Sequence, residues 1–307
     1  MALRRPEDGR ISPGRECLPS AGGKGGWGRD RSRLCSCGGS SREPADGPGG
    51  CSPVGTRAGV SNGRQATPAG IAERLLGWTA AGVANTADSD NATSRNIAGH
   101  MTEAIVGLPG ASSAPTNPGR ELEVQTAGYL ESRLHQLDPQ GMWHVNSGYA
   151  ISRFAQYRHL EDIRRIVAED ESGTLKEFVG GDYIIAPDVV AWRDSDALPT
   201  LHAAVACKWT IRSDRVQNIR HEAVVLLRHR RGHAPHIVVV TPEPLPSRLA
   251  SIARGTGEVD CTYHIALDAL RKAVADHGTK EQRTVLAELL AHRRLADVSE
   301  LPSALLS

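Results

Sequence analysis

Net charge, long apolar runs and closely spaced cysteines are all scarce in this sequence. Its 307 residues carry 36 Lys and Arg against 35 Asp and Glu, a formal charge of +1. A polycationic tail is therefore excluded, and any nucleic-acid binding must use local charge. No apolar run approaches the roughly 20 residues that span a bilayer, and Arg4 and Arg5 are followed by polar sequence, unlike a signal peptide. We expect a soluble, cytoplasmic protein that does not contact a membrane.

The six cysteines are too few for a disulfide scaffold in a chain of this length and form no C-x-x-C pair, so we expect reduced thiols. Residues 1–67 hold four of them, together with 15 of the 32 glycines and only scattered apolar residues. Such a segment buries too little apolar area to offset its ordering entropy. We therefore predict a disordered extension rich in Gly, Ser and Arg over 1–67, and a folded domain over 68–307. A basic arm that touches nucleic acid, and a metal site formed by Cys35, Cys37 and Cys51, remain alternatives for the extension.

From about residue 71 the composition is that of a globular domain, and no internal repeat interrupts it. A β-branched stretch bounded by glycines and a polar turn predicts a strand, and the next apolar stretch a second strand paired with it as a hairpin. A helix with Asp214 as its N-cap and Gly232 as its stop then leads to a short, nearly all-apolar strand, the pattern of a parallel crossover. The fold class predicted is α/β with a mixed central sheet. The expected strands are 183–190, 201–209, 236–241 and 262–266, and the expected helices are 121–137, one through Leu160, Ile163, Ile166 and Val167, 214–231, 246–252, 267–275 and 281–293.

Charged residues follow the expected strands at positions that suit phosphodiester hydrolysis. Asp188, after Pro187, ends one strand, Lys208 ends its neighbour, and Glu222 lies two turns into the following helix. Carboxylates bind hard divalent cations, a lysine is a compact cation for a phosphate or an attacking water, and Glu123 would add a further carboxylate. The competing interpretation is a commonplace Pro-Asp pair and a solvated lysine, although a carboxylate beside an apolar helix face is costly without a partner.

Two arginines flank an aspartate directly after this lysine, at Arg212, Asp214 and Arg215. In the DNA major groove, arginine recognises guanine and a carboxylate accepts from the amino group of cytosine, so the segment suits a G·C-rich target. The alternative is a capping aspartate with two surface arginines in salt bridges.

The same residues carry a resemblance to a known family. The run Ala206-Cys207-Lys208-Trp209-Thr210-Ile211-Arg212-Ser213-Asp214-Arg215, followed by Gln217, Asn218 and Glu222, resembles the catalytic and recognition segment of NgoMIV-type Type II restriction endonucleases, of the PD-(D/E)xK nuclease superfamily. The resemblance continues through 234–241, 243–244, 246–248 and 255–261, and upstream through 96–98 and 108–110. It covers the chain from about residue 70 to its end.

This resemblance implies a restriction-endonuclease-like fold and Mg²⁺-dependent cleavage of double-stranded DNA at a palindrome resembling GCCGGC, after the first G, with a 5′ overhang. It also implies that Asp188, Lys208, Glu222 and Glu123 form the active site, and that the main-chain carbonyl of Cys207 helps to hold the metal. By the same resemblance, Arg212, Asp214 and Arg215 match the residues that read the central CCGG, and Asp88 and Arg248 match those at the outer G·C pair.

Two further implications concern partners and departures from the family pattern. Such enzymes assemble as dimers, or as tetramers of two back-to-back dimers, and are matched by a DNA methyltransferase that protects the host site. Ala206 stands where the family has a serine, and the insertion 111–118 leaves Ala111 where a minor-groove glutamine would lie. A catalytically inactive DNA-binding protein of the same fold, and a repair nuclease of the same superfamily, are therefore the alternative functions.

Overall fold

A computed structural model of the chain describes residues 70–181, 185–194, 198–255 and 257–307. The expected extension over 1–67 and its cysteines lie outside the described residues, as do residues 183 and 184 of one expected strand.

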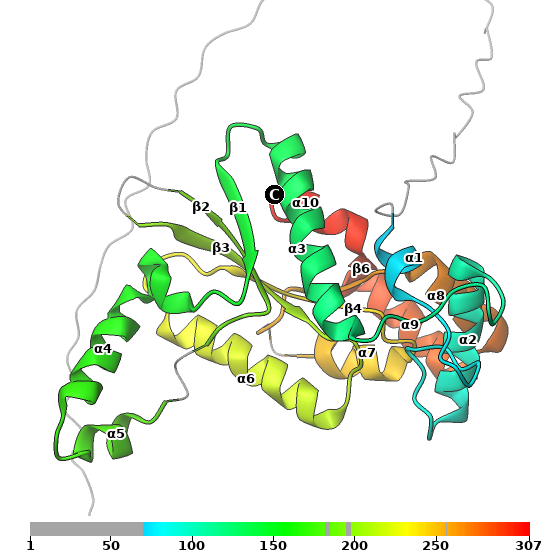
Figure 1. Ribbon diagram of the computed structural model, residues 1–307, viewed down its shortest axis with the longest axis horizontal. Helices are drawn as coiled ribbons and strands as arrows, with labels where there is room; N and C mark the ends of the chain where they lie inside the picture. The colour runs from blue at the N-terminus through cyan, green and yellow to red at the C-terminus, as the bar shows by residue number, and fades with distance from the viewer. Residues whose placement is uncertain (1–69, 182–184, 195–197, 256) are drawn as a thin grey trace, which may run out of the picture. The chain divides into compact units, whose positions relative to one another are not determined.

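Within the described residues, the centre of the fold is a mixed sheet of six strands in the order β1-β2-β3-β4-β5-β6 (Figure 1). The first three strands pair antiparallel, and β3 through β6 pair parallel. The predicted α/β class with a mixed central sheet is confirmed. The strands are β1 Trp143–Ser147, β2 Val189–Arg193, β3 Thr200–Cys207, β4 His236–Thr241, β5 Cys261–His264 and β6 Leu295–Asp297.

The predicted hairpin exists, but its first strand was placed too early in the sequence. Strand β2 begins at Val189, which pairs with Val205 of β3, whereas Ile185 to Asp188 have no strand partner. Pro187 has no amide hydrogen for a ladder, and the carboxylate of Asp188 accepts the amide of Cys207 at 2.8 Å. The prediction also missed β1 and β6, which are the two edge strands of the sheet.

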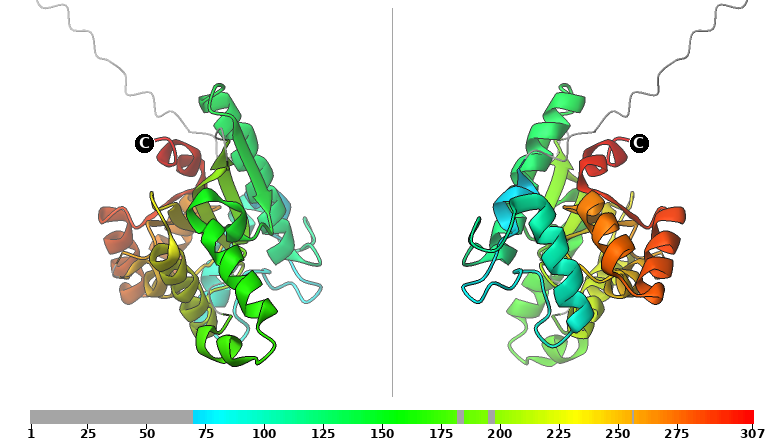
Figure 2. Two further views of the ribbon diagram at one scale, coloured as in Figure 1. Left: turned by 90° about the vertical axis from the view of Figure 1, so that its left-hand side faces the viewer. Right: turned by 90° about the vertical axis from the view of Figure 1, so that its right-hand side faces the viewer.

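Helices cover both faces of this sheet. Figure 2 shows α3 on one side and α6 and α9 on the other, and the apolar face of α3 buries Leu122, Leu130 and Leu134. Helices α7, α8 and α9 lie within two residues of their predicted bounds. The helices are α1 Ile71–Leu75, α2 Ala92–Val106, α3 Pro118–Leu137, α4 Arg158–Glu169, α5 Thr174–Val179, α6 Ser213–His229, α7 Pro246–Ala253, α8 Leu267–His277, α9 Lys280–Ala291 and α10 Leu301–Ala304, with 3-10 turns at Ile151–Arg153, Ala155–Tyr157 and Val298–Glu300.

The capping residue predicted for α6 was wrong. Its N-cap is Arg212, whose carbonyl accepts the amide of Val216 at 3.0 Å, so the first helical bond begins two residues before Asp214. Asp214 lies instead in the first turn, where a carboxylate favours the helix dipole. The helix ends at His229 and Arg230 is extended, so Gly232 does not form the stop.

The connection between β1 and β2 carries α4 and α5, which extend away from the sheet (Figure 1). Helix α4 forms where the apolar spacing predicted it, yet Ile166 is 53% exposed and Phe178 of α5 is 84% exposed. Among the described residues, no helix is both long enough and apolar enough to cross a membrane.

Candidate functional site

The start of β2 and the end of β3 bring Asp188 and Lys208 together. The two strands are antiparallel neighbours, so a residue before β2 faces a residue after β3. The Lys208 Nζ lies 2.6 Å from Asp188 Oδ2, and the same oxygen accepts the Cys207 amide at 2.8 Å. Both charged side chains are about one-fifth exposed, which leaves the pair open to a ligand while limiting its hydration.

Glu222 approaches this pair from α6. Burial raises the pKa of the Glu222 carboxyl, the nearby Asp188 carboxylate adds to the shift, and Lys208 opposes it. A half-buried carboxylate beside a second carboxylate is a common arrangement for holding a cation. The structure thus brings Asp188 and Lys208 into contact and places Glu222 within electrostatic reach of both.

Glu123 lies on α3. Its Oε2 is 2.6 Å from Arg120 Nη1, one helical turn earlier. Burial raises the pKa of the Cys207 thiol, and both Asp188 and Glu123 add to that shift. Glu123 therefore lies close enough to affect Cys207 electrostatically, although its carboxylate is directed to Arg120.

The donor set suits a hard cation. Carboxylate and carbonyl oxygens, which Mg²⁺ prefers, are available from Asp188, Glu222 and the main chain of Cys207. In the part of the chain that the structure describes, no three His, Cys, Asp or Glu side chains are grouped to hold a metal. Asp188 is engaged by Lys208 and Glu123 by Arg120. The chemistry of these oxygens fits the cation, and the carboxylates themselves are partnered within the chain.

A second group of predicted residues surrounds a cavity of about 630 Å³. Asp88, from the loop before α2, is hydrogen-bonded to Arg248 of α7, and Arg212 lines the same cavity from the start of α6. The Arg248 hydrogen bond lowers the pKa of Asp88, with help from the Asp90 amide and from Arg212. Residues that were not among the predicted site residues complete the wall, namely Asp90, Ile211, Ser213, Val216, Gln217, Arg220, Ser247 and Ser251.

Asp214 and Arg215 do not line this cavity. Asp214 is exposed on the first turn of α6, and Arg215 Nη1 donates to the carbonyl of Thr210 at 3.1 Å and to its hydroxyl at 2.9 Å. These hydrogen bonds connect α6 to the loop between Lys208 and the helix. The three residues of the Arg-Asp-Arg segment therefore lie at the start of α6, and of the three only Arg212 lines the cavity.

Glu243 is the residue of this region that sequence reasoning missed. Its side chain is fully buried, and burial raises the pKa of its carboxyl to about 7. The Ile211 amide donates to Glu243 Oε2 at 2.9 Å, directly before Arg212. The signals in the sequence are a charged residue between Pro242 and Pro244 after an apolar strand, and the place of Glu243 in the segment 243–244 that resembles the family.

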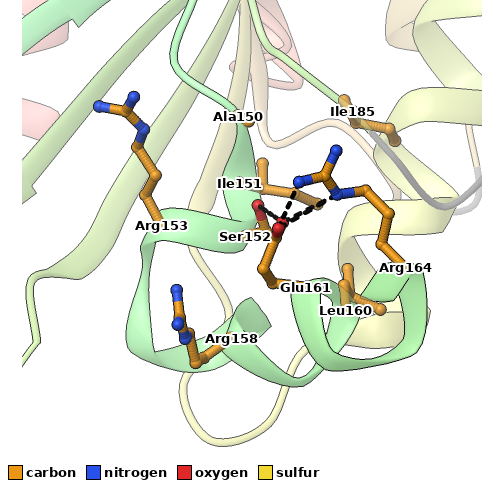
Figure 3. Close-up of a pocket in the computed structure, with 9 residues that line it drawn as sticks. All are labelled: Ala150, Ile151, Ser152, Arg153, Arg158, Leu160, Glu161, Arg164 and Ile185. Carbon is orange, nitrogen blue, oxygen red and sulfur yellow. Dashed lines mark hydrogen bonds and ion pairs between the residues drawn. The ribbon is translucent and has the colours of Figure 1, made fainter. Parts of the chain in front are cut away.

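A separate cavity, of about 500 Å³, lies in the connection between β1 and β2 (Figure 3). Glu161 is directed to Ser152 and Arg164, with Arg164 Nε 3.1 Å from its Oε1. Arg153 and Arg158 also line it. None of the site residues predicted from the sequence is among its lining residues.

Comparisons with known proteins identify the family of the chain. A sequence model of the NgoMIV restriction enzyme family matches residues 70–197 and 193–306. The Type II restriction enzyme NgoMIV of Neisseria gonorrhoeae is 34% identical over 268 residues, which cover 74% of this chain and 91% of that enzyme.

Among solved structures, the pre-specific restriction endonuclease BsaWI in complex with DNA is similar at 14% identity, over 57% of this chain and 64% of that one. The TM-score is 0.28, too low to support an argument about the fold. The family match spans the sheet and the site. The chain therefore belongs to the NgoMIV family of Type II restriction endonucleases.

Proposed function

We propose that this protein is a Type II restriction endonuclease that uses Mg²⁺ to cut both strands of a palindrome resembling GCCGGC, after the first G, leaving a 5′ overhang. The observation that carries the proposal is the contact of Asp188 with Lys208 at the adjoining ends of β2 and β3, with Glu222 close enough to interact electrostatically with both. A carboxylate pair that can hold a metal ion, with a lysine beside it, suits in-line attack of water on a phosphodiester.

Each of these side chains has a distinct task. Lys208 places a compact positive charge next to the scissile phosphate, and its contact with Asp188 fixes where that charge lies. Asp188, Glu222, Glu123 and the Cys207 carbonyl would hold Mg²⁺, which supplies neutralisation of the phosphate and polarisation of water when bound. The limited exposure of Asp188 and Lys208 strengthens these charge interactions.

Recognition is assigned to the helix start and the cavity beside it. Arg212, Asp214 and Arg215 would read the central CCGG, where arginine contacts guanine and a carboxylate accepts from cytosine. Asp88 and Arg248, which contact each other across the cavity, would read the outer G·C pair. The residues proposed to read the central and the outer base pairs thus meet at one cavity, which Arg212 and Arg248 both line.

The assembly proposed is a homo-oligomer, either a dimer on one site or a tetramer of two back-to-back dimers. A palindromic target matches a two-fold symmetric protein. A cognate DNA methyltransferase would protect the same site in the host, with no direct contact implied. Sedimentation equilibrium distinguishes the assemblies, and comparison of one-site with two-site plasmids shows whether two bound sites speed cleavage.

A second candidate is a catalytically inactive, sequence-specific DNA-binding protein. The observation that favours it is Ala206, which leaves no hydroxyl two residues before Lys208. This candidate gives site-specific gel retardation with intact DNA at every Mg²⁺ concentration. A repair nuclease instead prefers mismatched over perfect duplexes.

The direct test of the proposed activity is incubation of plasmid DNA with the purified protein and Mg²⁺, from which we expect a discrete set of fragments. Asp188→Asn should reduce the cleavage rate by about 10³-fold, because this carboxylate supports several kcal/mol of charge stabilisation, while DNA binding persists. Asp276→Asn, an exposed carboxylate on α8, is the matched control and should cut normally. An Asp188→Asn protein that still cuts at the normal rate would show that the metal assignment is wrong.

A further inference from the structure

Glu243 is a fully buried carboxylate outside the catalytic pair. It follows β4 directly and lies between Pro242 and Pro244, which restrict the backbone on both sides. Burying a carboxylate costs several kcal/mol unless hydrogen bonds replace its water. A chain that retains one here must hold it with specific partners.

Those partners are backbone groups of two different segments. Glu243 Oε2 accepts the amide of Ile211 at 2.9 Å, and Oε1 accepts the amide of Leu245 at 3.2 Å. The main chain of Glu243 is held as well, because its carbonyl lies 3.2 Å from His264 Nε2. His264 Nδ1 accepts the amide of Ala266 at 3.0 Å, so Nε2 carries the hydrogen and donates it to Glu243.

Each segment held in this way begins a helix that carries a proposed reading residue. Ile211 precedes Arg212, the N-cap of α6, and Leu245 is the N-cap of α7, which carries Arg248. Arg248 Nη1 is also 3.8 Å from Glu243 Oε1, and its other nitrogen binds Asp88. The Glu243 carboxylate therefore connects the segment that carries Arg212, which we propose reads the central bases, to Arg248 and Asp88, which we propose read the outer base pair.

We infer that Glu243 is a positioning residue for sequence recognition, which sets Arg248 relative to the start of α6 so that the outer base pair is read in register with the central ones. This inference rests on the proposed function, which assigns Arg212 and Arg248 to DNA. Among the residues proposed to read the central bases, Arg215 is held by Thr210 without Glu243. Arg248 is instead held by Glu243 and Asp88. Recognition of the outer base pair should therefore depend most on Glu243.

The test compares full-length wild-type protein with Glu243→Gln on duplexes that share the central CCGG and carry each of the four possible outer pairs. Single-turnover cleavage rates with Mg²⁺ give the ratio of the preferred outer pair to the others. A mismatched base pair typically costs from about fivefold to over a hundredfold in discrimination, and we expect Glu243→Gln to lose about tenfold of the outer-pair discrimination. Substitution of a central pair should still be rejected to nearly the wild-type degree. Glu288→Gln, an exposed partner of Arg254 on α9, should leave every ratio unchanged.

A pH series on wild-type protein tests the same inference without a variant, in case Glu243→Gln does not fold. The charged or titratable groups that face Glu243 are Arg248 from α7, Asp88 from the loop before α2, and His264 from β5. Arg248 is always charged, Arg248 lowers the pKa of Asp88, and burial lowers the pKa of His264 to about 4. Between pH 6 and 8, therefore, Glu243 is the one of these four that titrates. Outer-pair discrimination should rise with pH across this range, and the ratio removes pH effects on the chemistry itself.

Two results would overturn the inference. One is an equal loss of rate on all duplexes in Glu243→Gln, which indicates a purely structural role. The other is an outer-pair ratio unchanged by both the substitution and the pH. Failure of wild-type protein to cut any of the duplexes is a different outcome, because it removes the proposed function on which the inference stands.

Discussion

At the scale of the residue, a buried carboxyl group links protonation to stability. Burial raises the pKa of Glu243 from 4.5 to about 7, although the amides of Ile211 and Leu245 and the charge of Arg248 oppose the shift. The folded chain therefore binds a proton more tightly at this group than the unfolded chain does. Such a group contributes stability that is present below about pH 4.5 and is lost as the pH rises through about 7.

The free energy of unfolding should record this loss. Relative to Glu243→Gln, wild-type protein should lose on the order of 3 kcal/mol between pH 4.5 and pH 7.5, because only wild-type protein gives up the proton. Urea unfolding of both proteins at each pH measures the difference, and the pairwise subtraction cancels groups such as His264, whose lowered pKa acts in the opposite direction. A difference that stays constant with pH would mean that Glu243 does not titrate in this range.

The residues of the site differ in how far the sequence reveals them. Asp188, Lys208 and Glu222 could be placed together because strand ends and helix turns bring predictable positions to one edge of a sheet. Glu243 could not, because its partners are the backbone amides of Ile211 and Leu245, which leave no trace in residue types. The direction of Glu123 toward Arg120 was equally invisible, since a helix offers several neighbours to a carboxylate.

At the scale of the element, α3 supports the part of the sheet that carries the site. It packs against β1, β2 and β3 through residues that recur at helical spacing. Its start at Pro118, three residues before the predicted start, follows from Asn117, whose side chain accepts the amide of Arg120 at 3.2 Å. The same helix carries Glu123, which influences Cys207 electrostatically.

Truncation of a single side chain of α3 should show this support. Leu130 is 0% exposed, so Leu130→Ala should lower the free energy of unfolding by about 2–5 kcal/mol through lost burial and the cavity left behind. Val124→Ala on the same helix is the control, because Val124 is 47% exposed and should cost much less. Urea unfolding at constant pH compares the two, and similar losses would contradict the packing described.

The elements also show where sequence patterns mislead. Ile185 and Ala186 belong to a stretch with the composition of a strand, yet β2 begins only at Val189, because Pro187 has no amide hydrogen for a ladder and the Asp188 side chain accepts the Cys207 amide. Strands β1 and β6 escaped prediction since each is short and draws its stability from a neighbouring strand rather than from its own pattern. The long helices and the all-apolar β4 were predictable because their periodicity is local.

At the scale of the whole molecule, we propose that residues 68–307 form the complete catalytic and recognition domain. Both proposed groups, the catalytic pair and the cavity lined by Arg248, are built from residues after position 70. Removal of residues 1–67 should therefore leave the fragment pattern of a plasmid digest unchanged, and a urea unfolding midpoint close to that of the full chain serves as the control for folding. A truncated protein that folds but no longer cuts would assign these residues a part in the activity.

The central claim, that this molecule cuts DNA at one defined palindrome, is tested most directly by sequencing the ends of the fragments it releases. Plasmid of known sequence is digested to completion with the full chain and Mg²⁺, and both strands are read at every terminus. We expect every terminus to map to one G·C-rich palindrome resembling GCCGGC, with a 5′ overhang from cleavage after the first G. Termini scattered over unrelated sequences, or DNA that stays intact while it is bound, would contradict the account.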